Sequence, residues 1–207
     1  FQIKYKNKTY SLCVNLIGKV QIKNILMAMI AAGKSDLKFE RIVKKINKIK
    51  SVSGRLEKIG KLKNNSTVIL DYAHTPDALK NCLQNIKDQF SNRRISIVFG
   101  CGGNRDKDKR SQMGKIANKF CHKIYLTDDN PRFENPRKIR LSIKKFIEKN
   151  KLFEISNREK AIFSAMGSLN SGEILLVAGK GHEEDQDYGS YIRKFSDKKT
   201  ILKFIKK

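Results

Sequence analysis

The sequence contains no long hydrophobic run. Its longest apolar stretches, such as residues 174–179 (ILLVAG), are far shorter than the ~20 residues that a membrane-spanning helix needs. No basic segment followed by an apolar one opens the chain, so nothing indicates secretion. The chain begins with Phe1 rather than Met, which suggests a piece of a longer protein. We therefore expect a cytoplasmic protein that has no membrane partner.

Cysteines are few and far apart. The four of them, Cys13, Cys82, Cys101 and Cys121, form no C-x-x-C pair. A zinc site or a disulfide framework needs closer spacing or an oxidising compartment. The histidines also lack the spacing of metal ligands. The sequence therefore predicts reduced cysteines and no metal site built by this chain.

Acidic residues are scarce relative to basic ones: 20 Asp and Glu face 45 Lys and Arg, for a formal net charge of +25. A balance this basic raises nucleic acid as a partner. However, only 11 of the basic residues are arginine, and the lysines are spread almost evenly along the chain. Proteins that read nucleic acids concentrate arginine and aromatic side chains on one face. We expect no nucleic-acid partner, and a basic nucleic-acid-binding module stays as an alternative.

Two phosphate-binding motifs are also missing. Residues 100–103 (GCGG) resemble the start of a dinucleotide fingerprint, but Arg105 stands where the third glycine would be. Residues 179–181 (GKG) lack the upstream glycine and the following Ser or Thr of a P-loop. This chain therefore does not bind a nucleoside triphosphate by itself in the usual way.

The spacing of apolar residues divides the chain near residue 54. Residues 1–14 alternate loosely and predict a β-hairpin, and two helical patterns follow, from Gly18 to Gly33 and over 37–49. The pattern breaks at residues 51–54, where we place a domain boundary.

Beyond the boundary, strand-like runs alternate with helical patterns. We expect strands at 56–62, 67–72, 95–100, 123–127, 153–156, 174–179 and 191–195, and helices at 76–90, 111–121, 136–149, 157–169 and 197–206. Near-continuous apolar strands between helices favour a mostly parallel sheet that is covered on both faces. The predicted fold class is therefore α/β and doubly wound.

Two of these helices have sequence signals at their first turn. Thr75 is placed to cap the helix that starts at Pro76, a residue suited to the first helical position. Ser156 and Glu159 have the spacing of a capping box and predict a second helix start.

Polar and glycine-rich segments follow four of the predicted strands. They are residues 71–76, 100–106, 128–132 and 179–183. In a doubly wound sheet, ligands bind beyond the carboxyl ends of the strands. We therefore expect these four segments to meet at one edge of the sheet.

The side chains at that edge have the chemistry that a small zwitterion needs. Arg105 and Arg132 can each hold a carboxylate through paired hydrogen bonds. Asp129, Asn130 and Glu183 can accept hydrogen bonds from an ammonium group. An amino acid carries both groups, so the sequence predicts an amino-acid site.

Five motifs of the chain resemble the C-terminal part of the Mur ligases, ATP-dependent amide-forming enzymes of peptidoglycan synthesis. They are GRLE at 54–57, DYAHTPDAL at 71–79, FGCGGNRDKDKR at 99–110, DDNPR at 128–132 and AGKGHE at 178–183. In order and spacing they resemble the members that add the third residue of the stem peptide. The resemblance implies that residues 1–53 end the central ATPase domain and that residues 54–207 form the Rossmann-like C-terminal domain.

The resemblance also implies an activity. ATP would phosphorylate the γ-carboxylate of UDP-N-acetylmuramoyl-L-alanyl-D-glutamate, and the amine of the incoming amino acid would attack the acyl phosphate. Mg²⁺ would be bound mainly by the absent central domain, so we expect this chain alone to be inactive and to contain no catalytic residue. The expected partners are small molecules only, and the expected state is a monomer.

Site residues carry over by motif. Those that look like the amino-acid pocket are Arg105, Asp129, Asn130, Pro131, Arg132, Gly179 and Glu183. Those that look like the C-terminal side of the ATP site are Asn24, Arg55, Asp71 and His74, with Asp71 facing the ribose. The family usually has Phe and Asn where Val20 and Gln21 stand, and we interpret Gln21 as a modified contact on the adenine side.

The arginine of DDNPR indicates which amino acid is added. It resembles the branch that adds meso-2,6-diaminopimelate, which is lysine with a second carboxylate at its far end. With lysine bound, a buried arginine without a partner would cost about 3–5 kcal/mol. We therefore predict diaminopimelate, with a lysine-adding ligase of the same family as the alternative.

Overall fold

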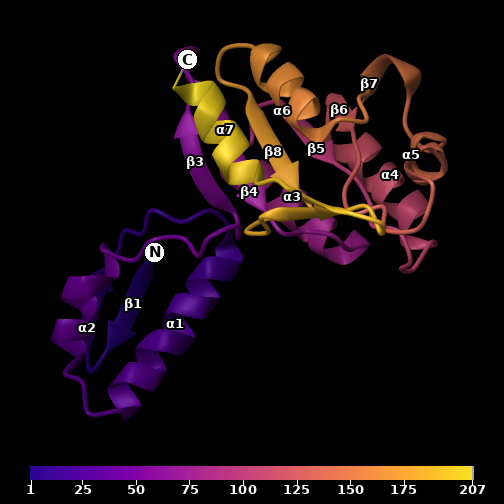
Figure 1. The fold of residues 1–207 in the computed structure, drawn as a ribbon. Coiled ribbons are helices and arrows are strands. Elements are labelled where there is room, and N and C mark those ends of the chain that lie inside the picture. The colour runs from indigo at the N-terminus through magenta and orange to yellow at the C-terminus, as the bar shows by residue number, and fades with distance from the viewer. Residues whose placement is uncertain (207) are drawn as a thin grey trace.

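The structure is a computed structural model and describes residues 1–206. Its first part, residues 1–53, is a small unit of a hairpin and two helices (Figure 1). Lys6 and Asn7 both have positive φ, as a tight two-residue hairpin turn requires. A buried cluster of its own, centred on Ile25 and Met29, holds this unit together. Its elements are β1 (Gln2–Tyr5), β2 (Lys8–Ser11), α1 (Lys19–Lys34) and α2 (Phe39–Ile46).

The larger part of the chain is built on a six-stranded sheet (Figure 1). The strand order is β3-β4-β8-β5-β6-β7, with β3 antiparallel to β4 and every other neighbouring pair parallel. The mostly parallel sheet predicted from the sequence is confirmed. The strands are β3 (Glu57–Lys61), β4 (Thr67–Asp71), β5 (Ile95–Phe99), β6 (Lys123–Leu126), β7 (Leu152–Glu154) and β8 (Ile174–Ala178).

Helices cover both faces of this sheet, as expected. One buried cluster joins the sheet to α3, α4 and α5, and a second joins the opposite face to α6 and α7. In β4, Ile69 belongs to the first cluster, whereas Val68 and Leu70 belong to the second. Alternate residues of a strand point to opposite faces, so a strand buried on both faces is apolar throughout. The helices are α3 (Pro76–Gln89), α4 (Lys109–Phe120), α5 (Pro136–Lys144), α6 (Arg158–Gly167) and α7 (Asp197–Ile205), with a 3-10 turn at Lys149–Lys151.

The two parts meet at the start of α1. The backbone N–H of Gly18 donates to Gln89 Oε1 (2.8 Å), and that of Lys19 donates to Asn85 Oδ1 (3.0 Å). Both acceptors lie on α3, so side chains of the larger part satisfy N–H groups that the first turn of a helix leaves free.

Apart from small shifts in the bounds of several elements, three differences from the sequence predictions stand out. A second small sheet pairs β9 (Asp185–Asp187) with β10 (Ile192–Lys194), and the sequence patterns did not indicate β9. Helix α5 ends at Lys144 rather than near residue 149. The prediction of Ser156 as a helix cap is wrong, because Asn157 accepts the N–H of Lys160 and the backbone carbonyl of Ser156 instead accepts the Thr127 hydroxyl.

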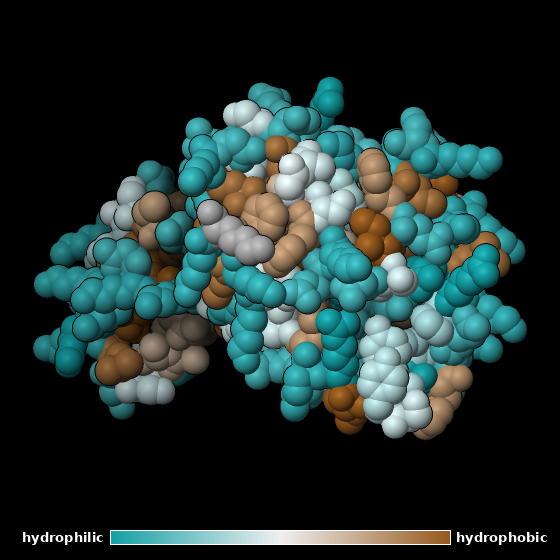
Figure 2. Space-filling model, turned by 45° about the horizontal axis from the view of Figure 1, so that its top comes forward, coloured by the Kyte–Doolittle hydropathy of each residue, from teal (hydrophilic) through white to brown (hydrophobic). Residues whose placement is uncertain are grey.

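The hydrophilic side chains of the surface do not gather in a single patch. Figure 2 shows hydrophilic residues over the whole visible face, among small apolar islands. Some basic side chains are inside: Arg110, Arg140 and Arg158 are buried and paired with carboxylates. None of the helices within residues 1–206 is long and apolar enough to cross a membrane.

Candidate functional site

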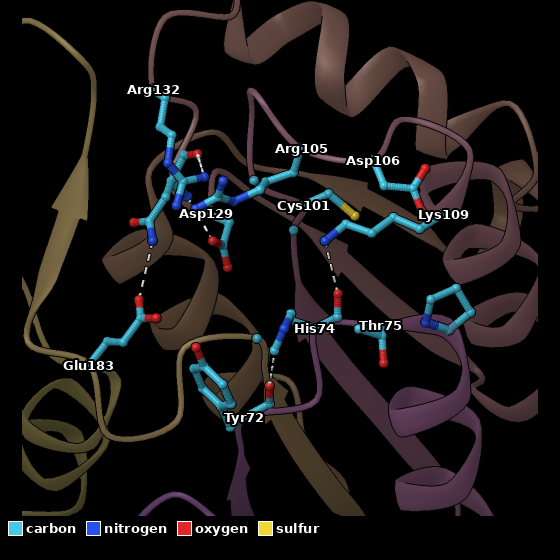
Figure 3. Close-up of a pocket in the computed structure, with 15 residues that line it drawn as sticks. Tyr72, His74, Thr75, Cys101, Arg105, Asp106, Lys109, Asp129, Arg132 and Glu183 are labelled. Carbon is cyan, nitrogen blue, oxygen red and sulfur yellow. Dashed lines mark hydrogen bonds between the residues drawn. The ribbon is translucent and has the colours of Figure 1, made fainter.

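A cavity of about 430 Å³ lies at the carboxyl ends of the central parallel strands. Segments that follow β4, β5, β6 and β8 line it, so the four segments expected to meet do meet (Figure 3). Six of the seven residues expected to hold an amino acid line this cavity. These six are Arg105, Asp129, Asn130, Arg132, Gly179 and Glu183.

The loops after β5 and β6 lock together beside the cavity. Gly103 N–H donates to Asn130 O (2.9 Å), and a Cβ on Gly103 would lie only 1.9 Å from the carbonyl oxygen of Pro131. Pro131 is the seventh expected residue; it does not line the cavity and packs against Gly103 instead. Buried Arg110 holds Glu134 through two bonds of 2.9 and 3.0 Å, which fixes the end of the second loop. The locked loops set where the neighbouring arginines project.

The two arginines of the cavity differ in their surroundings. Arg132 donates to Gly103 O (2.9 Å), and its Nε lies 3.5 Å from Asp187 Oδ2. Arg105 is exposed and makes no hydrogen bond or ion pair within the described part of the chain. Both guanidinium groups point toward the same space above Asp129 (Figure 3). An anionic group placed there would meet two cations.

The surroundings of Arg132 correct one premise of the diaminopimelate prediction. Arg132 is not a buried arginine without a partner, because its side chain is 24% exposed and pairs with Asp187. A ligand without a distal carboxylate therefore leaves Arg132 solvated and paired. The penalty of several kcal/mol against lysine, which was derived for an isolated buried charge, does not apply at this site.

Glu183 faces the arginines from the other side of the cavity. Its Oε2 accepts from Asn130 Nδ2 (3.2 Å) and from Lys180 Nζ (2.7 Å). Asn130 Oδ1 accepts from the same Lys180 Nζ (2.9 Å). Lys180 is fully buried. Glu183 is therefore an oriented carboxylate whose Oε2 takes both of these bonds. Its carboxylate also lies beside the Tyr72 hydroxyl, whose pKa is raised by burial and by the charge and hydrogen bond of Glu183.

Asp129 lies at the floor of the cavity. Its Oδ1 accepts from the N–H of Asn130 (2.8 Å), while its buried Oδ2 has no hydrogen-bond partner. The closest cation to Oδ2 is Arg158 Nη1, at 3.9 Å. Arg158 is fully buried and donates its Nε and Nη2 to Asp197, both at 2.8 Å. Asp129 thus places a carboxylate at the floor of the cavity, with one oxygen bonded to the backbone and the other buried against Arg158.

The residues expected to contact ATP are only partly brought together. His74 lines the cavity, and Arg55 lies 4.7 Å above the ring of Tyr72, which in turn lies 4.6 Å from the His74 ring. Asp71 lies beneath this group, where its carboxylate accepts the N–H groups of Leu56 and Ala73, both at 2.7 Å. Burial raises the pKa of Asp71 despite these bonds.

Asn24 is separate from this group. It is exposed on α1, bonds to Gln21 (3.4 Å) and does not line the cavity. The substitution at Gln21 therefore affects a contact on the surface of α1.

Three side chains near the site were not singled out from the sequence. Tyr72 and Lys109 line the cavity, and Lys109 donates to the carbonyl of His74 (3.1 Å). Lys180 lies directly behind the cavity and touches two of its polar residues. Tyr72 and Lys180 stand inside the DYAH and GKGHE motifs, which was the available signal.

The fold and the site together define an α/β domain with a polar cavity at the carboxyl ends of its strands, the place where such sheets bind ligands. A family model described as "Mur ligase, glutamate ligase domain" matches residues 54–181, more than half of the chain. The chain belongs to the Mur ligase family.

Among its curated relatives are two proteins named UDP-N-acetylmuramoyl-L-alanyl-D-glutamate--2,6-diaminopimelate ligase. The protein from Rickettsia rickettsii is 42% identical over 203 residues, which cover 98% of this chain and 42% of that protein. The protein from Rhizobium meliloti is 41% identical over 196 residues, which cover 95% of this chain and 40% of that protein. The chain thus spans about two fifths of the length of these relatives.

Solved structures agree with this assignment. A structure of a UDP-N-acetylmuramoyl-L-alanyl-D-glutamate--2,6-diaminopimelate ligase aligns with a TM-score of 0.75 and 31% identity over 99% of this chain and 42% of that chain. The UDP-N-acetylmuramate-alanine ligase of Thermotoga maritima aligns with a TM-score of 0.65 and 18% identity over 97% of this chain and 41% of that chain, which shows the shared fold.

Proposed function

We propose that this chain is part of an ATP-dependent ligase that joins meso-2,6-diaminopimelate to UDP-N-acetylmuramoyl-L-alanyl-D-glutamate in peptidoglycan synthesis. The names of relatives about 40% identical over nearly the whole chain support this activity. In this proposal residues 1–53 end the central ATPase domain, and residues 54–207 form the C-terminal domain. The separate buried cluster of the first part and the start of the family match at residue 54 support that boundary.

The observation that carries the proposal is the distribution of charge in the cavity. Arg105 and Arg132 point into one region, and Asp129 and Glu183 present carboxylate oxygens next to it. Diaminopimelate has a carboxylate and an ammonium group at each end. In our proposal the arginines bind the distal carboxylate through paired hydrogen bonds, and the two acids accept the distal ammonium. Asn130 and Gly179 line the space between them, and Pro131 supports its loop against Gly103.

ATP is the second substrate in this proposal. Arg55, Asp71 and His74 would form the near side of its site, since Tyr72 and His74 offer ring faces for a base and Arg55 a cation for phosphates. Asn24 on α1 would contribute from the adjoining part. In this proposal Mg²⁺ would be bound mainly by residues of the central domain.

The chain's own contribution to the reaction is to hold the nucleophile. The γ-carboxylate of the dipeptide substrate would be phosphorylated by ATP, and the α-amine of diaminopimelate would attack the acyl carbon and release phosphate. Fixing the distal end of diaminopimelate leaves its reacting amine with few orientations, which converts a bimolecular step into an oriented one. We propose that the ligase works on these small polar substrates in the cytoplasm and as a monomer.

A titration of the chain, followed by NMR, tests the proposal. Adding meso-2,6-diaminopimelate is expected to shift the amide signals of Arg105, Asn130, Arg132 and Glu183 in a saturable way, with L-lysine as the comparison ligand. The variant Arg105→Met is the sharpest control, because Arg105 has no protein partner to lose. It should weaken diaminopimelate binding about tenfold, as expected for one lost charge-assisted bond, and leave lysine binding unchanged.

The alternative of a lysine-adding ligase has one observation in its favour. Asp187 already supplies Arg132 with a carboxylate, so the site does not demand one from the ligand. Equal affinity for lysine and diaminopimelate would support that alternative and overturn the substrate named here.

A further inference from the structure

Lys180 is a buried ammonium group in direct contact with the cavity residues. Its side chain has no solvent exposure, yet it lies within the G-K-G-H-E segment that turns away from β8. Removing an ammonium from water is costly unless partners replace the water, so a fully buried lysine needs fixed acceptors. The acceptors here are two side chains of the proposed amino-acid site, Asn130 and Glu183.

The three side chains form a closed triangle. Lys180 Nζ donates to Glu183 Oε2 (2.7 Å) and to Asn130 Oδ1 (2.9 Å), and Asn130 Nδ2 donates to the same Glu183 Oε2 (3.2 Å). Asn130 Oδ1 also accepts the N–H of Asp187 (3.1 Å). The amide of Asn130 therefore has one possible orientation, since reversing it would bring its N–H groups toward a cation and another donor.

This triangle determines what Glu183 offers to a ligand. Lys180 and Asn130 both donate to Oε2, so neither of these two donors occupies Oε1. Without Lys180, Oε2 keeps only the longer of these two bonds, the one from Asn130 (3.2 Å), and the carboxylate is held less firmly. The pre-arranged carboxylate loses less conformational freedom when a ligand binds.

The backbone explains why the lysine points inward. Gly179 and Gly181 flank it, with φ of 111° and 52°, backbone values that residues with a Cβ rarely adopt. A Cβ on Gly179 would lie 2.8 Å from Asp129 Oδ2, and one on Gly181 would lie 2.8 Å from the Cβ of Tyr72. The N–H of Glu183 donates to the carbonyl of Lys180 (2.9 Å) and closes the turn. The two glycines thus allow the turn to pack closely against Asp129 and Tyr72, with the Lys180 side chain buried beneath it.

We propose that Lys180 is a positioning residue for the amino-acid substrate: it does not touch the ligand, and it fixes Glu183 and Asn130 in the orientation that accepts the ligand's ammonium group. This role rests on the proposed function. It extends that function to a residue whose contribution is made entirely through its two neighbours.

A double-mutant cycle tests this role. The variants are Lys180→Met, Glu183→Gln and the two combined, and the affinity of the chain for meso-2,6-diaminopimelate is measured by calorimetry. Lys180→Met should weaken binding by about tenfold or more in the wild-type background and by less than about threefold in the Glu183→Gln background. Such coupling is expected only if Lys180 acts through Glu183.

Two further variants keep the test decisive. Lys160→Met removes an exposed lysine of α6 and should leave the affinity unchanged. Lys180→Gln keeps a hydrogen-bond donor without the charge, so it should lose less affinity than Lys180→Met and serves in the cycle if the methionine variant does not fold. Folding is checked from the dispersion of the amide spectrum.

The outcomes separate the two hypotheses. If Lys180→Met leaves the affinity for diaminopimelate unchanged, or lowers it by the same factor in both backgrounds, the role of Lys180 is overturned and the proposed function is not. A wild-type chain that does not bind diaminopimelate overturns the proposed function, and the role of Lys180 with it.

Discussion

Replacing Asp187 by asparagine should increase the preference of the site for diaminopimelate over lysine. The carboxylate of Asp187 lies 3.5 Å from Arg132 Nε and also accepts the N–H of Gly189 through Oδ1 (2.8 Å). Asparagine keeps an oxygen at Oδ1 for Gly189 and has nearly the same shape. Asp187→Asn therefore removes the charge that Arg132 faces and little else.

The expected size of the effect follows from the exposure of the pair. The side chains of Arg132 and Asp187 are 24% and 39% exposed, so solvent screens their attraction and the pair contributes about 1 kcal/mol at most. A distal carboxylate on the ligand competes with Asp187 for the same guanidinium. Without that competition, diaminopimelate should bind about threefold to fivefold more tightly. Lysine has no distal carboxylate and should not gain.

Calorimetric titration of both ligands into wild-type and Asp187→Asn protein measures this difference. The gain should shrink as salt is raised, since both charges are partly exposed. Asp185→Asn is the matched control: Asp185 lies in the same hairpin and pairs with the exposed Lys194 instead of Arg132. Equal gains for lysine and diaminopimelate, or weaker binding of diaminopimelate, would refute the competition between Asp187 and the ligand.

Three further predictions concern the framework of the site. Gly103→Ala should lower the free energy of unfolding in urea by about 2 kcal/mol or more, because its Cβ would lie 1.9 Å from Pro131 O. Gly33→Ala on α1 is the control, since its Cβ meets open space and should not lower the free energy of unfolding. Equal stability of the two variants would contradict the close approach of Gly103 to Pro131. Arg158→Met should cost about 3–5 kcal/mol in the same assay by leaving buried Asp197 without its cation, and a loss below about 1 kcal/mol would argue against that pairing. Iodoacetamide at pH 8 should label exposed Cys13 alone, since burial raises the pKa of the Cys101 thiol to about 12. The labelled residues are identified by mass spectrometry, and labelling of Cys101 in the folded chain would contradict its burial.

Much of the fold could be predicted because the signals are local. The strands of the sheet are apolar throughout since both their faces are covered, and this pattern is readable from one segment at a time. Thr75 caps α3 as predicted, with Pro76 in its first turn. The cap at Ser156 could not be decided in this way, because the next residue, Asn157, is an equally good cap and takes that role.

The sequence predicted which residues meet at the candidate site, and it did not predict the contacts that these residues make. Strand ends in a parallel sheet must share an edge, so the segments carrying Arg105, Arg132 and Glu183 were expected together. The ion pair of Arg132 with Asp187 depends on a hairpin that the patterns did not reveal in full, since β9 has three residues and two of them are acidic. The premise that Arg132 is buried and left without a partner when lysine is bound was wrong for that reason.

The sequence by itself determined the fold class, the family and the group of residues at the edge of the sheet, because periodicity and motif spacing are properties of neighbours along the chain. Only the tertiary structure decided which of those residues are free for a ligand. Arg105 is free, Arg132 is shared with Asp187, and Glu183 is held by a lysine that is buried from solvent. The contacts of Asn130 with Lys180 and of Arg132 with Asp187 join residues 50 or more positions apart, which no local pattern records.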